Sequence, residues 1–377
     1  MVENAERVYI LSSHDISTAQ GTTEPYYVSK RLGLEYNVHV FAPVSGQIDN
    51  AQTHFLKIDG LAGTLLINLM LLPYWFWLCI FKPPDTVYSY RNIIFPAIIF
   101  KYICQSEVIY DIRADPYQQP KEMAPDSPLY RVFLWWSKRL HSIAFGYADT
   151  IVTLSKPLCT QLCRNFGVAE SKIHIVPLGV DASMFRPTPK RSDKFCVVYI
   201  GSMNEHRRLD IVISALATLS STTDIPVQLD VFGSADEKYT SVLTEQANKQ
   251  NVELNQHGFV NHKELPKLAG QADVAVSPLS GTTSFEVSSP AKIYEYLAMG
   301  LPVVATRITP HERILTDGRD SVLVPPDSVD GFADAFRRLA TDQSLRDRYS
   351  EAAREKGEEN SWDSRLDTIT AIIEDTQ

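Results

Sequence analysis

Cysteine is scarce in this sequence. Only five of the 377 residues are cysteines, and no two of them form a Cys-x-x-Cys pair. Neither a disulfide framework nor a cysteine-based zinc site is therefore indicated. The nine histidines show no metal-ligand spacing either. The pattern predicts reduced thiols, as in the cytoplasm, and no bound metal.

Positive charge is also in short supply. The chain has 36 Lys and Arg against 45 Asp and Glu, a formal net charge of −9. This balance argues against a nucleic-acid partner that is bound through bulk charge. The beginning of the sequence, MVENAERVYILSSHD, lacks the basic region and the apolar stretch of a signal peptide. We therefore interpret it as a first strand and expect a cytoplasmic location.

One long run has no charge at all. Residues 61–81, LAGTLLINLMLLPYWFWLCIF, comprise 21 uncharged residues, and at about 1.5 Å per residue a helix of this length spans a hydrocarbon core. Three interpretations stay open: a transmembrane span, a wholly buried helix, and a helix with one face in the lipid interface. The tryptophans of the run, and Trp135-Trp136 followed by two cations, are typical of an interfacial face. They predict peripheral contact with the inner face of the cell membrane.

Short apolar runs alternate with helical patterns along the whole chain. The runs are rich in β-branched residues and bounded by polar ones, as expected of buried parallel strands. Two such alternating halves predict an α/β protein with two facing, doubly wound, Rossmann-like domains and a C-terminal helical tail. The runs of the first half are 7–13, 37–43, 54–58, 85–89, 107–112, 149–155 and 172–177, and those of the second half are 194–201, 226–233, 273–278, 301–306 and 321–326.

A linker is predicted at RPTPKRSD, residues 186–193, because two prolines stand there among mixed charges. We therefore expect an N-terminal domain over 1–185 and a C-terminal domain over 194–360. Residues 361–377 are predicted to form a helix that packs back on the N-terminal domain. Ligands of such folds bind beyond the carboxyl ends of the strands.

The strongest motif is SSPAKIYEYLAMGLPVVAT, residues 288–306. Ser289 suits an N-cap, Pro290 suits the first helical position, and Gly300 suits the residue after the helix end. The free N–H groups at the helix start and the ammonium of Lys292 would attract a phosphate there. A plain helix with a solvated glutamate is the alternative.

Two further loops follow predicted strands. Gly201 begins a strand-to-helix loop that ends in Arg207 and Arg208, which can neutralise a diphosphate. YDIRADP places Asp111 and Arg113 at the end of another strand, where an ion pair that merely holds the loop is the alternative. Solvated basic residues are the alternative for the two arginines.

The combination resembles the retaining glycosyltransferases of the GT-B fold, specifically glycosyltransferase family 4. The motifs that carry the resemblance span nearly the whole chain: a Gly-bearing first loop, VPLGVD at 176–181, IGSMNEHRRLD at 200–210, HGFVNHKELP at 257–266, ADVAVSPL at 272–279 and YEYLAMGLPVVAT at 294–306. The resemblance implies a nucleotide-sugar donor bound mainly by the C-terminal domain and an acceptor bound mainly by the N-terminal one. It also implies domain closure over both.

The resemblance assigns roles to individual residues. Glu295 matches the glutamate that binds the ribose hydroxyls, and Arg207 or Arg208 matches the lysine on the diphosphate. Two positions depart from the pattern: the first of two family glutamates would fall on Val287, next to Glu286, and the usual arginine after the strand glycine is Ser202.

The resulting hypothesis is a hexosyltransferase that moves a sugar from UDP or GDP to a glycan or lipid-linked acceptor with retention. No cofactor is expected, and since the sequence has no DxD motif, no metal. A nucleotide-sugar epimerase and a non-catalytic partner subunit are the alternatives. The candidate catalytic residues are Asp111, Arg113, Arg207, Arg208, Lys292 and Glu286, and the candidate substrate-binding residues are Gly21, Thr22, Gly201, Ser202, Gly233, Val260, Ser288, Ser289 and Glu295.

Overall fold

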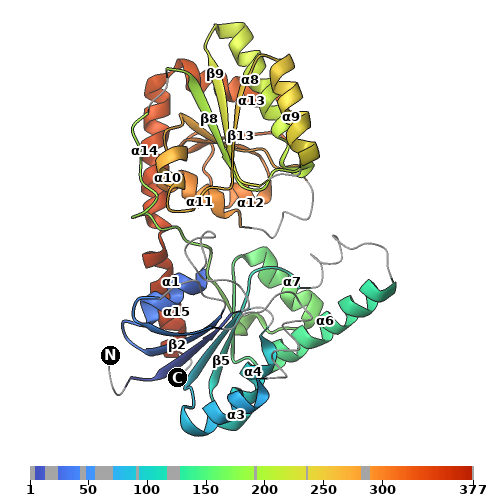
Figure 1. Ribbon diagram of the computed structural model, residues 1–377, viewed down its shortest axis with the longest axis vertical. Coiled ribbons are helices and arrows are strands. Elements are labelled where there is room, and N and C mark those ends of the chain that lie inside the picture. Colours follow the sequence, from blue (N-terminus) through green and yellow to red (C-terminus); the bar gives the residue numbers. More distant parts are fainter. Residues whose placement is uncertain are drawn as a thin grey trace. The chain divides into compact units, whose positions relative to one another are not determined.

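The chain folds into two compact units in a computed structural model. Unit 1 comprises Met1–Leu178 and Asp363–Gln377, and unit 2 comprises Gly179–Trp362. Each unit carries its own parallel sheet (Figure 1). The structure describes residues 5–12, 24–42, 48–55, 71–90, 93–116, 128–190, 193–234, 237–281 and 289–375.

The division between the units falls before the predicted linker. Residues 186–190 belong to unit 2. There Thr188 Oγ1 lies 3.2 Å from the carbonyl oxygen of Pro266, and Lys190 Nζ lies 2.6 Å from Asp273 Oδ1. Side-chain contacts therefore hold this proline-containing segment on unit 2, which its composition alone does not reveal.

Unit 1 is built on a seven-stranded sheet in the order β3-β2-β1-β4-β5-β6-β7, in which all neighbours are parallel. The central strands are buried apolar runs, as the sequence predicts for strands covered on both faces. The strands are β1 (Arg7–Leu11), β2 (Asn37–Ala42), β3 (Ala51–Phe55), β4 (Thr86–Tyr90), β5 (Glu107–Ile112), β6 (Thr150–Thr153) and β7 (Ile173–Ile175).

Helices connect these strands by crossovers. Because such crossovers are right-handed, the strand order places the β1-to-β2 helix on one face of the sheet and the helices between β3 and β7 on the other. The helical segments are α1 (Glu24–Leu32), α3 (Leu72–Phe81), α4 (Ile94–Ile99), the π-helix η1 (Phe100–Cys104), α6 (Pro128–Tyr147), α7 (Lys156–Phe166), η2 (Glu170–Lys172) and α15 (Trp362–Asp375).

The last helix, α15, completes unit 1 from the far end of the chain. Arg31 of α1 lies 3.5 Å from Asp367 of α15. The apolar side of α15 is buried, which shows that it is part of the core and not an appendage. Its buried side chains are Leu366, Ile369, Ile372 and Ile373.

The described part of the charge-free run is residue 71 and helix α3, whereas residues 56–70 lie outside the described residues. Trp75 is buried, with its ring centroid 5.3 Å from that of Phe41, so it does not belong to an interfacial face as the sequence analysis expected. Trp77 on the other side is exposed. Residues 72–81 are thus buried on one face only. Within the part of the chain that the structure describes, no helix is long and apolar enough to cross a membrane.

Unit 2 is built on a six-stranded parallel sheet in the order β10-β9-β8-β11-β12-β13. Five of its strands match predicted runs, and β10 was not predicted. It is an edge strand of sequence ELNQHG with half-exposed polar side chains, so it lacks the apolar signal. The strands are β8 (Phe195–Ile200), β9 (Val227–Phe232), β10 (Glu253–Gly258), β11 (Val274–Ser277), β12 (Val303–Thr306) and β13 (Ser321–Val324).

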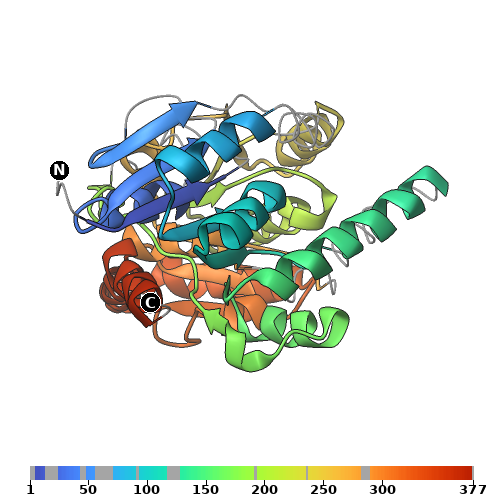
Figure 2. The ribbon, with the colours of Figure 1, turned by 90° about the horizontal axis from the view of Figure 1, so that it is seen from below.

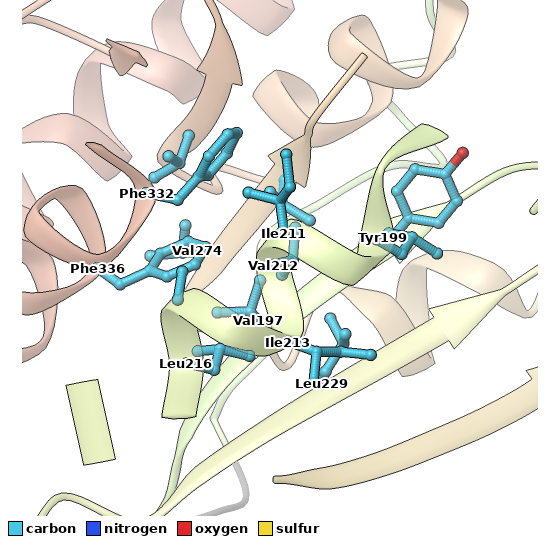
Figure 3. Packing of buried hydrophobic residues seen from close by; sticks show 14 of the residues in the cluster. Val197, Tyr199, Ile211, Val212, Ile213, Leu216, Leu229, Val274, Phe332 and Phe336 are labelled. Atoms are coloured by element: carbon cyan, nitrogen blue, oxygen red, sulfur yellow. The ribbon is translucent and has the colours of Figure 1, made fainter. Parts of the chain in front are cut away.

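Helices cover both faces of this sheet, and the core of unit 2 lies between the sheet and two of them. Figure 3 shows Leu216 of α8 and Phe332 and Phe336 of α13 packed around the strand residue Val197. The helical segments are η3 (Glu205–Arg207), α8 (Leu209–Thr223), α9 (Glu237–Lys249), α10 (Leu265–Ala269), α11 (Ala291–Ala298), α12 (Thr309–Glu312), α13 (Val329–Thr341) and α14 (Gln343–Glu359). The two parallel sheets confirm the predicted pair of doubly wound, Rossmann-like domains.

Candidate functional site

Two predicted glycines meet at the carboxyl ends of β8 and β9. Gly201 and Gly233 have φ of 134° and 139°, in the region that favours glycine. The N–H of Gly201 donates to the carbonyl oxygen of Phe232 at 2.8 Å. A Cβ added to Gly233 would lie 2.1 Å from the carbonyl oxygen of Gly201. Only glycines allow these backbones to approach so closely, which leaves main chain bare at the strand ends.

Lys292 reaches this glycine edge from the first turn of α11. Its Nζ lies 4.0 Å from the centre of the Tyr199 ring, at the end of β8. A Cβ added to Gly201 would lie 2.8 Å from the same Nζ, so the amine occupies the space beside that glycine. Burial and the nearby cation of Arg207 lower the pKa of Lys292 well below its usual range, despite the opposing effect of Glu295. An anion bound here would relieve that unfavourable environment.

The start of α11 differs from the prediction by one residue. Pro290 is the N-cap and Ala291 is the first helical residue, whereas Ser289 and Pro290 were predicted for these places. The hydroxyl of Ser289 lies 3.4 Å from that of Tyr294 and caps no helical N–H. Gly300, with φ of 68°, follows the helix end as predicted.

Tyr296 attaches α11 to the sheet. Its buried hydroxyl accepts a hydrogen bond from the N–H of Ile200 at 2.7 Å and donates to the carbonyl oxygen of Val276 at 3.4 Å. These bonds hold the second half of α11 against the carboxyl-terminal parts of β8 and β11. This residue could not be predicted from the sequence, because its role depends on contacts between distant segments.

The two predicted arginines have different surroundings. Arg208 has φ of 47° and pairs with Asp210, with Nη2 and Oδ2 3.1 Å apart, and with Asp327. Arg207 instead lies close enough to Lys292 to lower its pKa. Carboxylates thus already neutralise Arg208, and Arg207 is the arginine that shares a site with Lys292.

Glu295 is buried and not solvated. Its Oε1 lies 2.9 Å from Nε2 of His262, and the His262 ring centroid lies 4.9 Å from that of Phe185. His262 belongs to the HGFVNHKELP motif, but no spacing in the sequence indicates this pairing. The histidine orients the carboxylate that the resemblance assigns to ribose.

His311 lies beneath the site. Its Nδ1 lies 2.6 Å from the carbonyl oxygen of Thr306, which can only accept, so Nδ1 carries the proton and Nε2 accepts from the Ser277 hydroxyl at 3.0 Å. Burial, together with the charge of Lys292, lowers the pKa of His311 to about 4. The ring is therefore neutral at physiological pH and adds no cation to the site.

The remaining candidates of unit 2 that the structure describes are Ser202 and Val260. Ser202 is exposed, and its carbonyl oxygen accepts from the Tyr199 hydroxyl at 2.9 Å. Val260 is half-buried in the turn after β10. Glu286 and Ser288 lie outside the described residues, as do Gly21, Thr22 and Val287.

In unit 1, Arg113 stands at the centre of a buried network. Its Nε and Nη2 donate to Asp111 Oδ1 and Oδ2 at 2.5 and 2.6 Å, and Nη1 donates to the carbonyl oxygen of Val176 at 2.6 Å. Nη2 also pairs with Glu24, the first residue of α1, and the hydroxyl of Tyr88 donates to Asp111 at 2.8 Å. Burial and the Asp111 charge raise the pKa of Tyr88 well above its usual range.

This network joins the ends of β5 and β7 to the start of α1. Asp111 is fully buried and Arg113 nearly so, so both orient the loops around them. Asp115 is buried as well and accepts from Asn165 Nδ2 at 2.8 Å. The described residues, this network included, contain no group of three or more His, Cys, Asp or Glu side chains that could hold a metal ion.

Two adjacent family models match the chain. Residues 181–356 match the model described as glycosyl transferases group 1, and residues 117–184 match the one described as Glycosyltransferase Family 4. The two matches together run without a gap from residue 117 to residue 356.

Curated relatives match part of their length. The D-inositol 3-phosphate glycosyltransferase of Pseudarthrobacter chlorophenolicus is 30% identical over 243 residues, which are 61% of this chain and 56% of that protein. The MMP alpha-(1->4)-mannosyltransferase of Mycolicibacterium hassiacum is 26% identical over 253 residues, 64% of this chain and 60% of that protein. The matched region is thus less than two thirds of either relative.

Solved structures are similar over nearly the entire chain. Sucrose-phosphate synthase of Thermosynechococcus elongatus has a TM-score of 0.76 at 14% identity, covering 98% of each chain. HepE of Anabaena, solved with UDP and glucose, has a TM-score of 0.71 at 15% identity, covering 98% of this chain and 100% of its own. At such identities the similarity concerns the fold.

Proposed function

Because the chain belongs to glycosyltransferase family 4 and has the GT-B fold, we propose that it transfers a sugar from a nucleotide diphosphate to an acceptor. The observation that carries this proposal is the position of Lys292 beside Gly201, with Arg207 close by. A desolvated ammonium, an arginine and bare backbone at strand ends suit a diphosphate.

The proposed reaction stabilises the leaving group. The bond between the anomeric carbon and the diphosphate oxygen breaks, and the acceptor oxygen forms a bond on the same face, so the configuration is retained. The acceptor proton passes to an oxygen of the departing phosphate. Lys292 and Arg207 share the negative charge that develops there, and no covalent nucleophile is required.

Glu295 is the proposed ribose-binding residue. A carboxylate fixed by His262 at 2.9 Å is restricted in orientation, which suits bidentate acceptance from two adjacent hydroxyl groups. UDP is the first nucleotide to test, because HepE was solved with UDP. GDP is the second candidate, and we propose a hexosyl group and no metal requirement in either case.

The proposed acceptor is a lipid-linked glycan or a precursor of a cell-surface polysaccharide, used at the inner face of the cell membrane. Among the relatives are the phosphatidyl-myo-inositol mannosyltransferases of Mycolicibacterium smegmatis and Mycobacterium leprae, whose names point to a lipid acceptor. The network around Arg113 would shape the loops that meet the acceptor in unit 1.

Incubation with radiolabelled UDP- and GDP-sugars and a panel of acceptors tests the proposal. Transfer of label to an acceptor in the presence of EDTA is the expected result. Interconversion of free nucleotide sugars would identify an epimerase instead. Tight binding of a nucleotide sugar with no conversion across the panel would indicate a non-catalytic subunit.

A further inference from the structure

Four neighbouring helical segments on one face of unit 1 carry cations and no carboxylate. The segments α3, α4, η1 and α6 contain Lys101, Arg131, Lys138 and Arg139, and not one Asp or Glu. Asp and Glu make up 45 of the 377 residues, so a surface of this length with none is unusual for the chain. Asp149 neutralises Lys101, with Nζ and Oδ2 2.5 Å apart, so the positive charge of these segments comes from the three cations of α6, in a protein whose net charge is −9.

The same helices expose most of the large apolar side chains. Of the fifteen exposed large hydrophobic residues in the described part of the chain, ten lie on α3, η1 and α6. Isolated exposed apolar residues are ordinary, but such a concentration marks an interaction surface. We call it the aromatic face, and its main members are Trp77, Ile80, Phe81, Tyr102, Trp135 and Trp136, which are 45% to 73% exposed.

These helices are neighbours. The ring centroids of Trp75 in α3 and Phe100 in η1 are 5.9 Å apart, and Cys104 Sγ lies 3.9 Å from the carbonyl oxygen of Cys79. Tyr147 at the end of α6 donates to the carbonyl oxygen of Ile94 in α4 at 3.1 Å. In Figure 2 the helices coloured from blue to green lie next to one another. The segments that carry the aromatic face therefore belong to one group of packed helices in unit 1.

Helix α6 has the two-sided pattern of an interfacial helix. Leu134 and Ala144 are buried, whereas Val132 and Ile143 are exposed. The guanidinium carbon of Arg139 lies 5.4 Å from the Trp135 ring centroid, so a cation stands directly beside an exposed indole. Tryptophan next to arginine or lysine is the composition of the region between lipid headgroups and acyl chains.

We propose that the aromatic face docks on the surface of an anionic lipid bilayer. Its positive charge complements anionic headgroups, and its indole and phenol rings suit the interfacial region. A second copy that used the same face would oppose cations with cations, which disfavours a symmetric dimer. This inference deepens the proposed function, because such docking would bring unit 1 to a lipid-linked acceptor.

Vesicle flotation of the full-length protein, without donor or acceptor, tests the docking. The parent should float with vesicles of phosphatidylglycerol and phosphatidylcholine, and far less with phosphatidylcholine alone. The double variant Trp77→Ser, Trp135→Ser should bind about tenfold or more weakly. The matched control is the double variant Val242→Ser, Phe259→Ser. The side chains of Val242 and Phe259 lie in unit 2 and are 51% and 70% exposed, and this variant should bind vesicles as strongly as the parent does. Since no sugar is transferred, a failed activity assay leaves this result unaffected.

A second pair of variants separates charge from folding. Arg139→Glu should weaken the flotation of the protein with vesicles and reduce the dependence of this flotation on salt concentration. Lys263 is an exposed lysine of unit 2, and Lys263→Glu should change neither quantity. If the tryptophan double variant fails to fold, quenching of the parent's tryptophan fluorescence by brominated lipid decides the question. A parent that remains unbound, or binding that is equal in all variants, would overturn the proposal. So would a parent dimer that becomes monomeric in the double variant, since a second copy would then cover the face.

Discussion

Lys292 holds an ammonium group where it is poorly solvated, so its protonation should be coupled to ligand binding. Burial lowers its pKa in the free protein well below 10.5, and a bound diphosphate should raise the pKa again. We therefore expect UDP binding to take up a proton, and its affinity to fall as pH rises above the lowered pKa. Calorimetry in buffers of different ionisation enthalpy measures the uptake.

The same shift has a consequence for the free protein. Between the lowered pKa and 10.5 the unfolded chain binds more protons at Lys292 than the native protein, so this residue makes stability increase with pH in that window. Lys292→Met should abolish both the proton uptake and this contribution while the fold survives. Buffer-independent binding enthalpies in the parent would contradict the assignment.

Arg207 and Arg208 should differ in their effect on turnover. Arg207→Ala should lower kcat on the order of a hundredfold or more, as for other groups that stabilise charge in a transition state. Arg208→Ala removes half-exposed pairs with Asp210 and Asp327 and should cost about 1 kcal/mol of stability or less, with a small change in kcat. Steady-state kinetics and denaturant unfolding of both variants check this, and equal kinetic defects would place both arginines on the diphosphate.

Glu295→Gln should weaken UDP binding by about 1 to 3 kcal/mol, because an amide is a poorer acceptor for two ribose hydroxyls than a carboxylate. The helix should persist, since Gln and Glu have similar helix propensity. Titration calorimetry with UDP and with inorganic pyrophosphate separates the ribose contact from the diphosphate contacts. The affinity for pyrophosphate should be the same in variant and parent. Equal UDP affinity in variant and parent would remove Glu295 from the nucleotide site.

At this scale the sequence indicates the candidate residues at strand ends and helix starts better than the residues that hold them in place. Gly201, Gly233 and Lys292 were predicted from their places at strand ends and a helix start, and the structure brings them together. Their role in binding stays a prediction. The roles of His262 and Tyr296 could not be predicted. Each forms a hydrogen bond with a residue that is distant in the sequence, Glu295 and Val276 respectively, and only the fold brings these residues together.

Among the elements, β5, α1 and the loop after β7 depend on a single guanidinium. Arg113→Met would leave the carboxylates of Asp111 and Glu24 buried without their cation, which should cost about 3 to 5 kcal/mol. Equilibrium unfolding in urea measures the loss. Arg319→Met is the matched control: its pair with Glu355 is 61% and 59% exposed, so the cost should be about 1 kcal/mol or less. Similar losses in the two variants would contradict a supporting role for the buried network.

Elements were predictable where burial dictates composition. The strands β8 and β12 are fully buried, and both appear as apolar runs. The edge strand β10 was missed because solvent on one side permits Asn255, Gln256 and His257. The start of α11 was misplaced by one residue, since the preference of proline for the first helical turn does not distinguish the N-cap from the first residue.

For the molecule as a whole, UDP should stabilise one unit selectively. At about 100 times its dissociation constant a ligand adds about 2.7 kcal/mol to the state that binds it. The candidate diphosphate residues all belong to unit 2, so hydrogen exchange should slow there, at the ends of β8 and β11 and in the first turn of α11. Protection confined to unit 1 would show that the nucleotide binds elsewhere.

The two-unit architecture follows from the alternation of strand and helix patterns, which depends on local sequence. The position of the division between the units does not follow from local sequence, because it depends on which surface Thr188 and Lys190 contact. Likewise, the sequence could not show which tryptophans of the charge-free run are exposed. An uncharged helix has no polar face to show its orientation, so the burial of Trp75 and the exposure of Trp77 emerge only with the sheet in place.

Unit 1 is discontinuous in the chain, since α15 joins it after the whole of unit 2. During translation, every residue of unit 2 leaves the ribosome before Ile369 and Ile373 can fill the core of unit 1. Although N-terminal domains usually fold first, unit 1 therefore cannot be completed before the whole of unit 2 has been synthesised. The half that is made first stays incomplete on one side until residues 363–375 have been made, so a nascent chain stalled before residue 363 would present unit 1 to chaperones with that side uncovered.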